Sequence, residues 1–427
     1  MKYLLLLLVS LSIVACSPDS EKILDLSSSV NEVKFIELRA DHKTLLPNGQ
    51  AKMTFRVIAY GVEDFATYEE EEKDGELIYV TGVSRDTFEI PMDRLPEGCI
   101  KLFTQDGEEV KNMEYSTVDP TLRTLTFYAQ VGELKSNEIQ IRIRELPQED
   151  YDEIVIPVIF HVLVPKTSIA PSYNVSSQEL QKRVEQLNNI FNGRLTTDPN
   201  GGNAKITFRL AEYSPSGAVL TELGKNKVDI DQVWSSSEYE EYIISELIWD
   251  PAKYLNIWLA DARSDYVAPQ VRLVGTSEIP GLETKEVMDF TREDVTSLTD
   301  VGILINIQDF LDTESRQTFD ISMVLGEYYG LLYTDQDDND EFVDGDNDYC
   351  ADTYSYYSGY NSSIYKNNRL YKEDPNASYE WFTSFNIMDR YSRKNSVTVD
   401  QVNRIRKVLD QCPSRWAYKS TWAFEGR

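Results

Sequence analysis

Carboxylate side chains dominate one short segment of the chain and give it the chemistry of a metal-binding loop. The segment DQDDNDEFVDGDND carries acidic residues at alternating positions, among them Asp335, Asp337, Asp344, Asp346 and Asp348. Oxygen-rich loops of this kind suit Ca²⁺, which takes about six to eight oxygen ligands. The glycine and glutamate offsets of an EF-hand are absent. Calcium binding and a solvated acidic loop therefore both stay open.

Nitrogen ligands, in contrast, are scarce. The chain contains only two histidines, His42 and His161. His161 lies in IVIPVIFHVLV, a nearly continuous apolar run that predicts a strand buried on both faces. A structural role for His161 is therefore favoured over metal ligation, and a site built from three histidines cannot be assembled.

The N-terminal residues predict where the protein is located. The sequence MKYLLLLLVSLSIVAC has a lysine, then an apolar run, then a small residue before Cys16. The run is too short to span a bilayer, so residues 1–15 are predicted to be a signal peptide. A small residue before a cysteine resembles a bacterial lipobox, which implies acylation of Cys16. Residues 16–30 are predicted to be a tether, and we expect a lipoprotein of the outer membrane, displayed at the cell surface.

Three further cysteines are present, at positions 99, 350 and 412. An exported protein occupies a compartment in which disulfides persist. Cys350 and Cys412 both belong to the C-terminal part of the chain and are candidates for a disulfide. Cys99 is then left over and is expected to be buried as a small apolar residue.

Composition limits the kinds of partner. The 427 residues are enough for two to three domains. Acidic residues number 72 and basic residues 42, which gives a formal net charge of −30. Such a field repels phosphate backbones, so nucleic acid is excluded as a partner.

Strand patterns dominate residues 31–146. In KMTFRVIAYG the apolar residues Met53, Phe55, Val57 and Ala59 alternate with other residues, which is the period of a half-buried strand. The same alternation recurs in RTLTFYAQVG and NEIQIRIRE, with turn signals between the runs. This pattern predicts an all-β immunoglobulin-like sandwich.

The pattern changes after a polar stretch at 145–153, which is predicted to be a linker. The apolar run that contains His161 is followed by SSQELQKRVEQLNNIFNG, where Ser176 and Glu179 form a capping box at the start of a helix. Alternating runs then predict more strands. A second domain over residues 150–427, of the α/β or α+β class, is therefore expected.

Four segments of this second region resemble one enzyme family. VIPVIFHVLV, WDPAKYLNIWLAD, CADTYSYY and FNIMDRYSRKNSVTVDQVNRIRKVLDQCP look like the pappalysin-type branch of the metzincin zinc proteases. In particular, they resemble the zinc-dependent metalloproteinase lipoproteins found in Bacteroidetes. The likeness covers residues 150–415 in the family's order. It implies a metzincin-like domain over 150–427 and makes Met388, in NIMD, the Met-turn residue beneath the metal.

The family's zinc motif, H-E-x-x-H-x-x-G-x-x-H, is degenerate in this chain. When its glycine is aligned with Gly330 of MVLGEYYGLLY, the histidine positions carry Met323, Glu327 and Tyr333. The position of the general-base glutamate carries Val324. Glutamate and tyrosine could supply oxygen ligands, but a thioether is a poor zinc ligand and a valine cannot transfer a proton. No zinc is therefore expected, and calcium stays a candidate for the acidic segment.

Three functions remain after this comparison. The favoured one is a catalytically inactive pseudoprotease, anchored to the membrane by its lipid, that binds a peptide or protein ligand in the former cleft. One alternative is an active metalloendopeptidase with unconventional ligands. The other is a cell-surface protein for glycan binding or adhesion. The identity of the ligand and the oligomeric state do not follow from the sequence.

Overall fold

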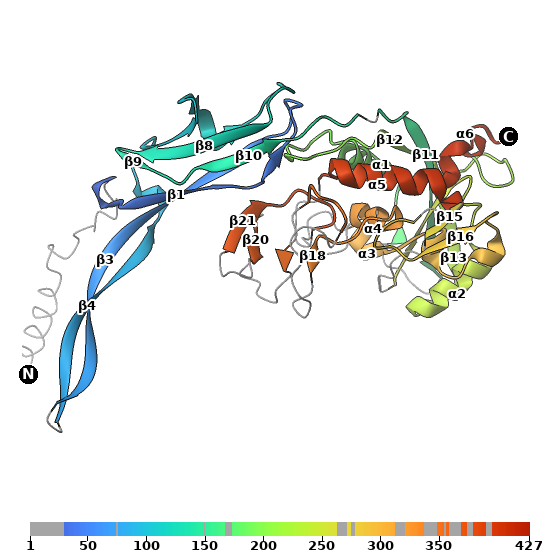
Figure 1. Cartoon of the computed structure of the whole chain (residues 1–427). Coiled ribbons are helices and arrows are strands. Elements are labelled where there is room, and N and C mark those ends of the chain that lie inside the picture. Colours follow the sequence, from blue (N-terminus) through green and yellow to red (C-terminus); the bar gives the residue numbers. More distant parts are fainter. Residues whose placement is uncertain are drawn as a thin grey trace, which may run out of the picture. The chain divides into compact units, whose positions relative to one another are not determined.

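The computed structural model describes most of the chain after the tether (Figure 1). The described residues are 30–73, 76–148, 150–166, 173–262, 271–274, 278–311, 321–336, 348–353, 356–357, 369–373, 379–389 and 395–427. Within this part of the chain, no helix is long and apolar enough to cross a membrane.

The chain forms two compact units, and each contains several segments. The smaller unit holds the described residues up to Arg39, together with Arg56–Met113 and Thr126–Ile139. The larger unit holds Ala40–Phe55, Glu114–Leu125 and the chain from Gln140 onward. Residues of the predicted module at 31–146 thus occur in both units, and its immunoglobulin-like arrangement stays a prediction.

A long antiparallel hairpin is the main feature of the smaller unit. Strand β3 (Met53–Lys73) pairs with β4 (Glu76–Ile90) from Ala59 opposite Ile90 to the turn. The four alternating residues predicted to face the core at the start of β3 are all buried, so the period-2 interpretation of this strand is confirmed. Where Gly61 faces Phe88, a Cβ on the glycine would lie 2.4 Å from the ring, so the aromatic ring packs over the bare backbone.

Short strands and turns complete the N-terminal region. Strand β5 pairs with both β6 and β8, β8 pairs with β9, β2 pairs in parallel with β10, and β7 pairs with β3. Their bounds are η2 (Val30–Glu32), β1 (Phe35–Ala40), β2 (Thr44–Leu45), η3 (Met92–Arg94), β5 (Ile100–Thr104), β6 (Glu109–Val110), η4 (Lys111–Met113), β7 (Glu114–Tyr115), β8 (Thr124–Val131), β9 (Leu134–Lys135) and β10 (Ile139–Ile143).

A parallel sheet lies at the centre of the larger unit. The first half of β11 (Ile154–Pro165) pairs with β12 (Ile206–Leu210), and its second half pairs with β13 (Lys225–Ile230). On the other side of β11, β14 (Leu255–Ala260) pairs with β11 and then with β17 (Gly302–Asn306). Residues 156–163 are all buried, as the continuous apolar run predicts for a strand covered on both faces.

Helix α1 (Ser177–Phe191) packs its apolar face into the core beside this sheet. The side chain of Ser176 accepts a hydrogen bond from the Glu179 backbone, and Glu179 accepts one from the Ser176 backbone, so the predicted capping box is confirmed. Its buried residues include Leu180, Val184 and Leu187. The capping box satisfies N–H groups that the first helical turn leaves without intrahelical partners.

The remaining elements make the larger unit a mixture of helices and strands, and the chain as a whole is a mixed α/β protein. Their bounds are α2 (Ser236–Glu246), β15 (Val271–Val274), β16 (Thr284–Val287), η6 (Arg292–Asp294), η7 (Leu298–Asp300), α3 (Ile307–Leu311), α4 (Ile321–Tyr328), β18 (Asp335–Gln336), β19 (Tyr356–Tyr357), β20 (Arg369–Glu373), β21 (Tyr379–Thr383), α5 (Val399–Gln411), η8 (Pro413–Lys419) and α6 (Trp422–Glu425).

Candidate functional site

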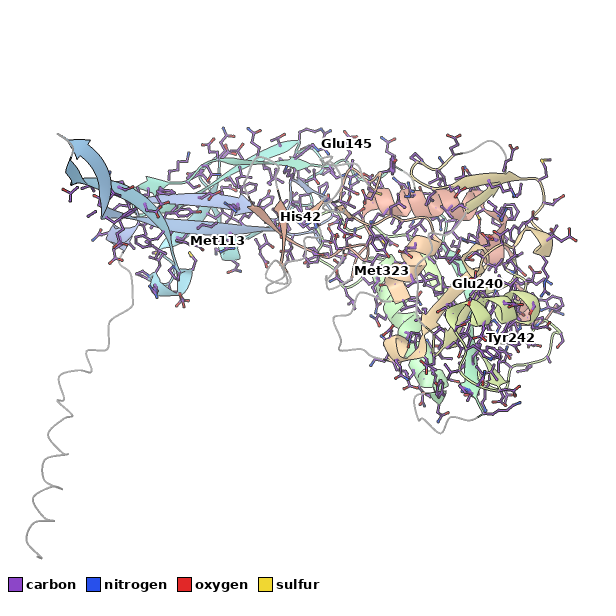
Figure 2. All side chains as sticks on the ribbon, turned by 90° about the horizontal axis from the view of Figure 1, so that it is seen from below. His42, Met113, Glu145, Glu240, Tyr242 and Met323 are labelled. Carbon is purple, nitrogen blue, oxygen red and sulfur yellow. The ribbon has the colours of Figure 1, made fainter. Side chains whose placement is uncertain are left out.

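Helix α4 carries the residues aligned with the zinc motif. Met323, labelled in Figure 2, and Glu327 are both buried, with exposed fractions of 2% and 7%. They lie one helical turn apart and therefore project from the same side of the helix. Val324 is partly buried and packs against the same apolar core. The helix thus presents a thioether and a carboxylate where the resemblance would place two imidazoles.

The backbone conformation at position 330 explains why a glycine is found there. Gly330 adopts a positive φ of 84° directly after α4. The N–H of Leu331 donates to the carbonyl of Gly326, and the N–H of Gly330 donates to that of Glu327. These two bonds form a Schellman motif, whose left-handed position favours glycine. A Cβ there would also lie 2.8 Å from Val408. Helix termination alone therefore explains why this glycine is present.

Met388 lies against α4. Its side chain is fully buried, and a Cβ at Gly326 would be 2.8 Å from its sulfur atom. The side chain of Asn386 holds the segment by accepting a hydrogen bond from the Met388 backbone at 2.8 Å. Tyr333 is partly buried against the same core. The aligned motif positions and the predicted Met-turn residue therefore belong to one packed region.

The carboxylate of Asp389 follows Met388 and is also buried. It accepts hydrogen bonds from the hydroxyl groups of Thr334 and Ser384. Burial raises its pKa to about 6, with a further contribution from the charges of Asp198 and Asp335. This group was not predicted from the sequence, where it appeared only as the last residue of NIMD.

Two of the five candidate calcium ligands lie among the described residues. Asp348 accepts hydrogen bonds from the Cys350 backbone at 3.1 Å and from the Thr353 hydroxyl at 2.9 Å, and Asp335 is buried. Asp337, Asp344 and Asp346 lie outside the described residues. Among those that are described, no group of three His, Cys, Asp or Glu side chains is placed to hold a metal ion. Calcium binding stays a prediction.

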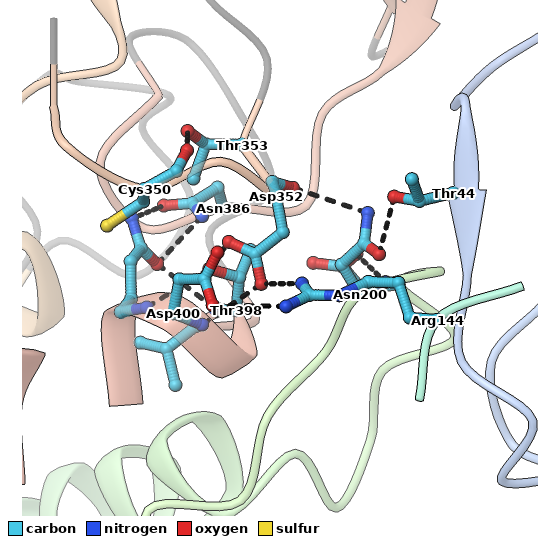
Figure 3. A network of polar contacts seen from close by, with 12 residues as sticks. Thr44, Arg144, Asn200, Cys350, Asp352, Thr353, Asn386, Thr398 and Asp400 are labelled. Atoms are coloured by element: carbon cyan, nitrogen blue, oxygen red, sulfur yellow. Dashed lines mark hydrogen bonds and ion pairs between the residues drawn. The ribbon is translucent and has the colours of Figure 1, made fainter. Parts of the chain in front are cut away.

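A partly buried ion-pair network joins segments that are far apart in the sequence (Figure 3). The guanidinium of Arg144 donates to Asp352, 208 residues later, and to Asp400 at 3.0 Å. The side chain of Asp352 is 1% exposed. Its carboxylate also accepts hydrogen bonds from the Thr398 hydroxyl at 2.6 Å and from the Asp400 backbone at 3.0 Å. Asp352 therefore binds both the arginine and the N-terminus of α5.

The same network extends from the backbone of Asp352. The side-chain amide of Asn200 donates to the Asp352 carbonyl at 3.3 Å, and the Thr44 hydroxyl donates to Asn200 at 2.9 Å. Asn386 and Gln401 exchange two side-chain hydrogen bonds, at 2.8 and 3.1 Å. These contacts connect α5 to the segment that carries Met388. The network therefore joins α5 to the segment whose Met388 packs against α4.

The two histidines have different environments. The imidazole of His161 is fully buried, accepts a hydrogen bond from Asn226 and donates one to Asn256, and burial lowers its pKa to about 4. For His42, burial lowers the pKa, but the hydrogen bond and charge of Asp41 outweigh it and leave the pKa raised. Both imidazoles are therefore held by neighbouring side chains.

The three described cysteines are free thiols. Cys350 and Cys412 are buried, and the structure does not join them, so the candidate disulfide is not formed here. Burial raises the pKa of the Cys350 thiol. Cys99 is only partly buried.

The buried carboxylates predict an unusual pH dependence. Burial raises the pKa values of Asp352 and Asp389 from 3.8 to about 6. Such groups bind protons more tightly in the folded state, so their contribution to stability is complete below about pH 4 and is lost as the pH rises through about 6. We therefore expect the melting temperature to rise by about 5 °C between pH 8 and pH 5. Thermal unfolding followed by circular dichroism checks this, and a melting temperature that falls steadily over this range would contradict it.

The chain is a mixed α/β protein whose larger unit is built around a parallel sheet. No protein-family model matches it. Among curated proteins, it is similar to the β subunit of chloroplastic acetyl-coenzyme A carboxylase carboxyl transferase of Nicotiana tabacum and of Nicotiana sylvestris. Each is 26% identical over 122 residues, which is 29% of this chain. The match spans only 23% of the length of each relative.

Two solved structures are also similar. One is mature mirolysin of Tannerella forsythia in complex with a cleaved peptide, with a TM-score of 0.41 and 20% identity over 64% of this chain and 98% of that one. The other is a promirolysin mutant of the same organism, with a TM-score of 0.40 and 20% identity over 64% of this chain and 86% of that one.

Proposed function

We propose that this protein is a surface lipoprotein whose larger unit is a metzincin-like scaffold without zinc catalysis, a pseudoprotease that binds a peptide or protein ligand. The observation that supports the proposal most directly is the pair on the buried side of α4, Met323 and Glu327. One helical turn apart, these residues occupy the positions at which the resemblance expects two imidazole ligands.

A zinc ion does not fit the side chains at these positions. A thioether is a soft, neutral ligand that suits Cu(I) better than Zn²⁺. A valine stands where the protease needs a carboxylate to accept a proton from water, and its hydrocarbon side chain cannot do so. The buried surroundings of α4 instead favour packing, because Met323 belongs to the main apolar core of the larger unit.

Ligand binding is the function that such a scaffold can keep after losing its chemistry. Recognition of a peptide needs shape, backbone hydrogen bonds and side-chain pockets, none of which depends on a metal. The resemblance places the ligand beside α4 and Tyr333. The acidic segment 335–348 follows shortly after Tyr333 in the sequence, and its carboxylates suit calcium as a ligand of the same region.

Metal content and proteolysis test this proposal together. Purified protein is expected to contain no stoichiometric zinc by elemental mass spectrometry, also after incubation with Zn²⁺ and gel filtration. It is expected to cleave no member of a random peptide library above background, as measured by mass spectrometry. Stoichiometric zinc with chelator-sensitive cleavage would instead establish the alternative, an active metalloendopeptidase with unconventional ligands. Binding to a glycan array would instead support the third candidate function, glycan binding or adhesion at the cell surface.

The membrane anchor has a separate test. If Cys16 carries the lipid, Cys16→Ala is expected to move the protein from the membrane fraction to the soluble fraction, because stable attachment depends on burial of the acyl chains. Protease treatment of whole cells then reports whether the natural protein is displayed at the surface. A Cys16→Ala variant that stays in the membrane fraction would contradict the lipobox interpretation.

A further inference from the structure

A cavity of about 550 Å³ lies in the larger unit. Its walls come from the loop before β14, from the segment between Met288 and Val295, and from the start of η8. None of its lining residues belongs to α4 or to the acidic segment 335–348. The volume lies within the range of about 300–1,000 Å³ that is usual for ligand pockets.

The cavity lies at one end of the strands of the parallel sheet. Asp250, Pro251 and Ala252 line it shortly before β14 begins, and Val301 lines it immediately before β17 begins. Asn256 of β14 pairs in register with Gly302 of β17, so both strands start at this same end of the sheet. The cavity is therefore built at the amino-terminal ends of two core strands, on loops that a rigid sheet positions.

Its walls are mainly apolar. Trp416 is held in place because its indole N–H donates to the Asp410 carbonyl at 3.1 Å. Phe290 and Val295 add an aromatic and an aliphatic surface. Met288 also lines the cavity although its exposed fraction is 84%, so the apolar surface continues outward to solvent. A flexible, exposed methionine beside an apolar pocket is typical of surfaces that contact other proteins.

The charged residues of the cavity favour a cationic ligand. The guanidinium of Arg292 is engaged, because it donates to the carbonyls of Ile244, at 3.0 Å, and Ser245. Asp250 accepts a hydrogen bond from the Ala252 backbone. The Asp289 carboxylate has no hydrogen bond or ion pair among the described residues and is exposed. The chain as a whole carries a net charge of −30, and a net charge of this sign attracts cations to the protein.

We propose that this cavity binds a peptide segment of a partner protein that presents an aromatic side chain followed by a lysine or arginine. The aromatic side chain enters the apolar cavity beside Trp416, and the cationic side chain pairs with Asp289. This second binding site does not depend on the α4 proposal, since it shares no lining residue with it.

Two short peptides test the site. The peptide acetyl-Gly-Phe-Lys-Gly-amide is expected to bind the purified full chain, with the strongest saturation transfer to its phenyl protons in ligand-detected NMR. The matched peptide acetyl-Gly-Phe-Glu-Gly-amide is expected to bind about fivefold more weakly, because a charge pair near the surface contributes up to about 1 kcal/mol.

Variants assign the binding to this cavity. Asp289→Lys is expected to weaken binding of the lysine peptide about fivefold. Asp93→Lys changes another exposed aspartate, on η3, and is expected to leave binding unchanged. Val295→Trp fills the cavity and is expected to abolish binding. Should that variant not fold, the comparison of the two aspartate variants decides. No binding of the lysine peptide, or equal binding to Asp289→Lys and the natural chain, would overturn the proposal.

Discussion

Replacing Arg144 by methionine is expected to lower the free energy of unfolding by about 3–5 kcal/mol, because it leaves the buried Asp352 carboxylate without its cation. The Asp352 side chain is 1% exposed, and Asp400 forms a second ion pair with the guanidinium of Arg144. Removing one partner of a buried ion pair costs far more than the pair contributes, since the remaining charge stays desolvated. Urea unfolding followed by circular dichroism measures the change.

The pH dependence of this effect separates lost charge from lost packing. The Asp352 carboxyl can escape its desolvation by taking up a proton, and its pKa is already raised to about 6 by burial. Arg144→Met is therefore expected to destabilise the protein more at pH 8 than at pH 5. Lys166→Met serves as control. Because Lys166 and its partner Asp231 are both exposed, this substitution should leave the free energy of unfolding unchanged. An Arg144→Met effect that is equal at both pH values would show that packing, not charge, explains it.

Local patterns in the sequence predicted the elements that depend on near neighbours. The capping box at Ser176 and Glu179 involves residues three apart. The burial of β11 at residues 156–163 was predicted by the nearly continuous apolar run IVIPVIFHVLV. In both cases the side chains that decide the structure lie close together in the sequence, so their spacing is enough to predict the local structure.

The Arg144 network could not be predicted in this way. Residues 145–153 appear in the sequence as a polar linker, and nothing in that stretch indicates that the arginine just before it meets an aspartate 208 residues later. The same limit applies to Asp352, which looks like an ordinary turn residue in CADTYSYY. Polar contacts between distant segments depend on the final fold, and single-sequence periodicity does not encode them.

Gly330 shows a different limit of sequence reasoning. The motif alignment treats it as the retained part of a catalytic signature, whereas the hydrogen bonds of Leu331 and Gly330 give it a complete role in ending α4. Any helix that ends in a Schellman motif favours glycine at this position. The glycine alone therefore cannot validate the alignment. The assignment of Met323 and Glu327 to the ligand positions has to be tested by substituting them.

Placing the family's ligands at the aligned positions is expected to create a zinc site. The combined variant Met323→His, Val324→Glu, Glu327→His and Tyr333→His supplies two imidazoles at i and i+4 and a third after the turn at Gly330. Three nitrogen ligands leave one open position for water, which is the arrangement of a catalytic zinc site. We expect about one zinc per chain by elemental mass spectrometry and a melting temperature that rises on addition of Zn²⁺, because binding to the folded state stabilises it.

A register control makes this expectation decisive. The pair Val324→His and Tyr328→His, combined with Tyr333→His, is also spaced i and i+4, but it projects from a face of α4 rotated by about 100°. If the alignment at Met323 and Glu327 is right, this control binds zinc much more weakly than the restored variant. A further variant with Val324→Gln in place of Val324→Glu should bind zinc without gaining proteolysis, since the amide cannot accept the proton from water. Equal zinc binding by the register control would show that histidines on a helix suffice, and zinc binding by the four-residue variant would then not support the alignment.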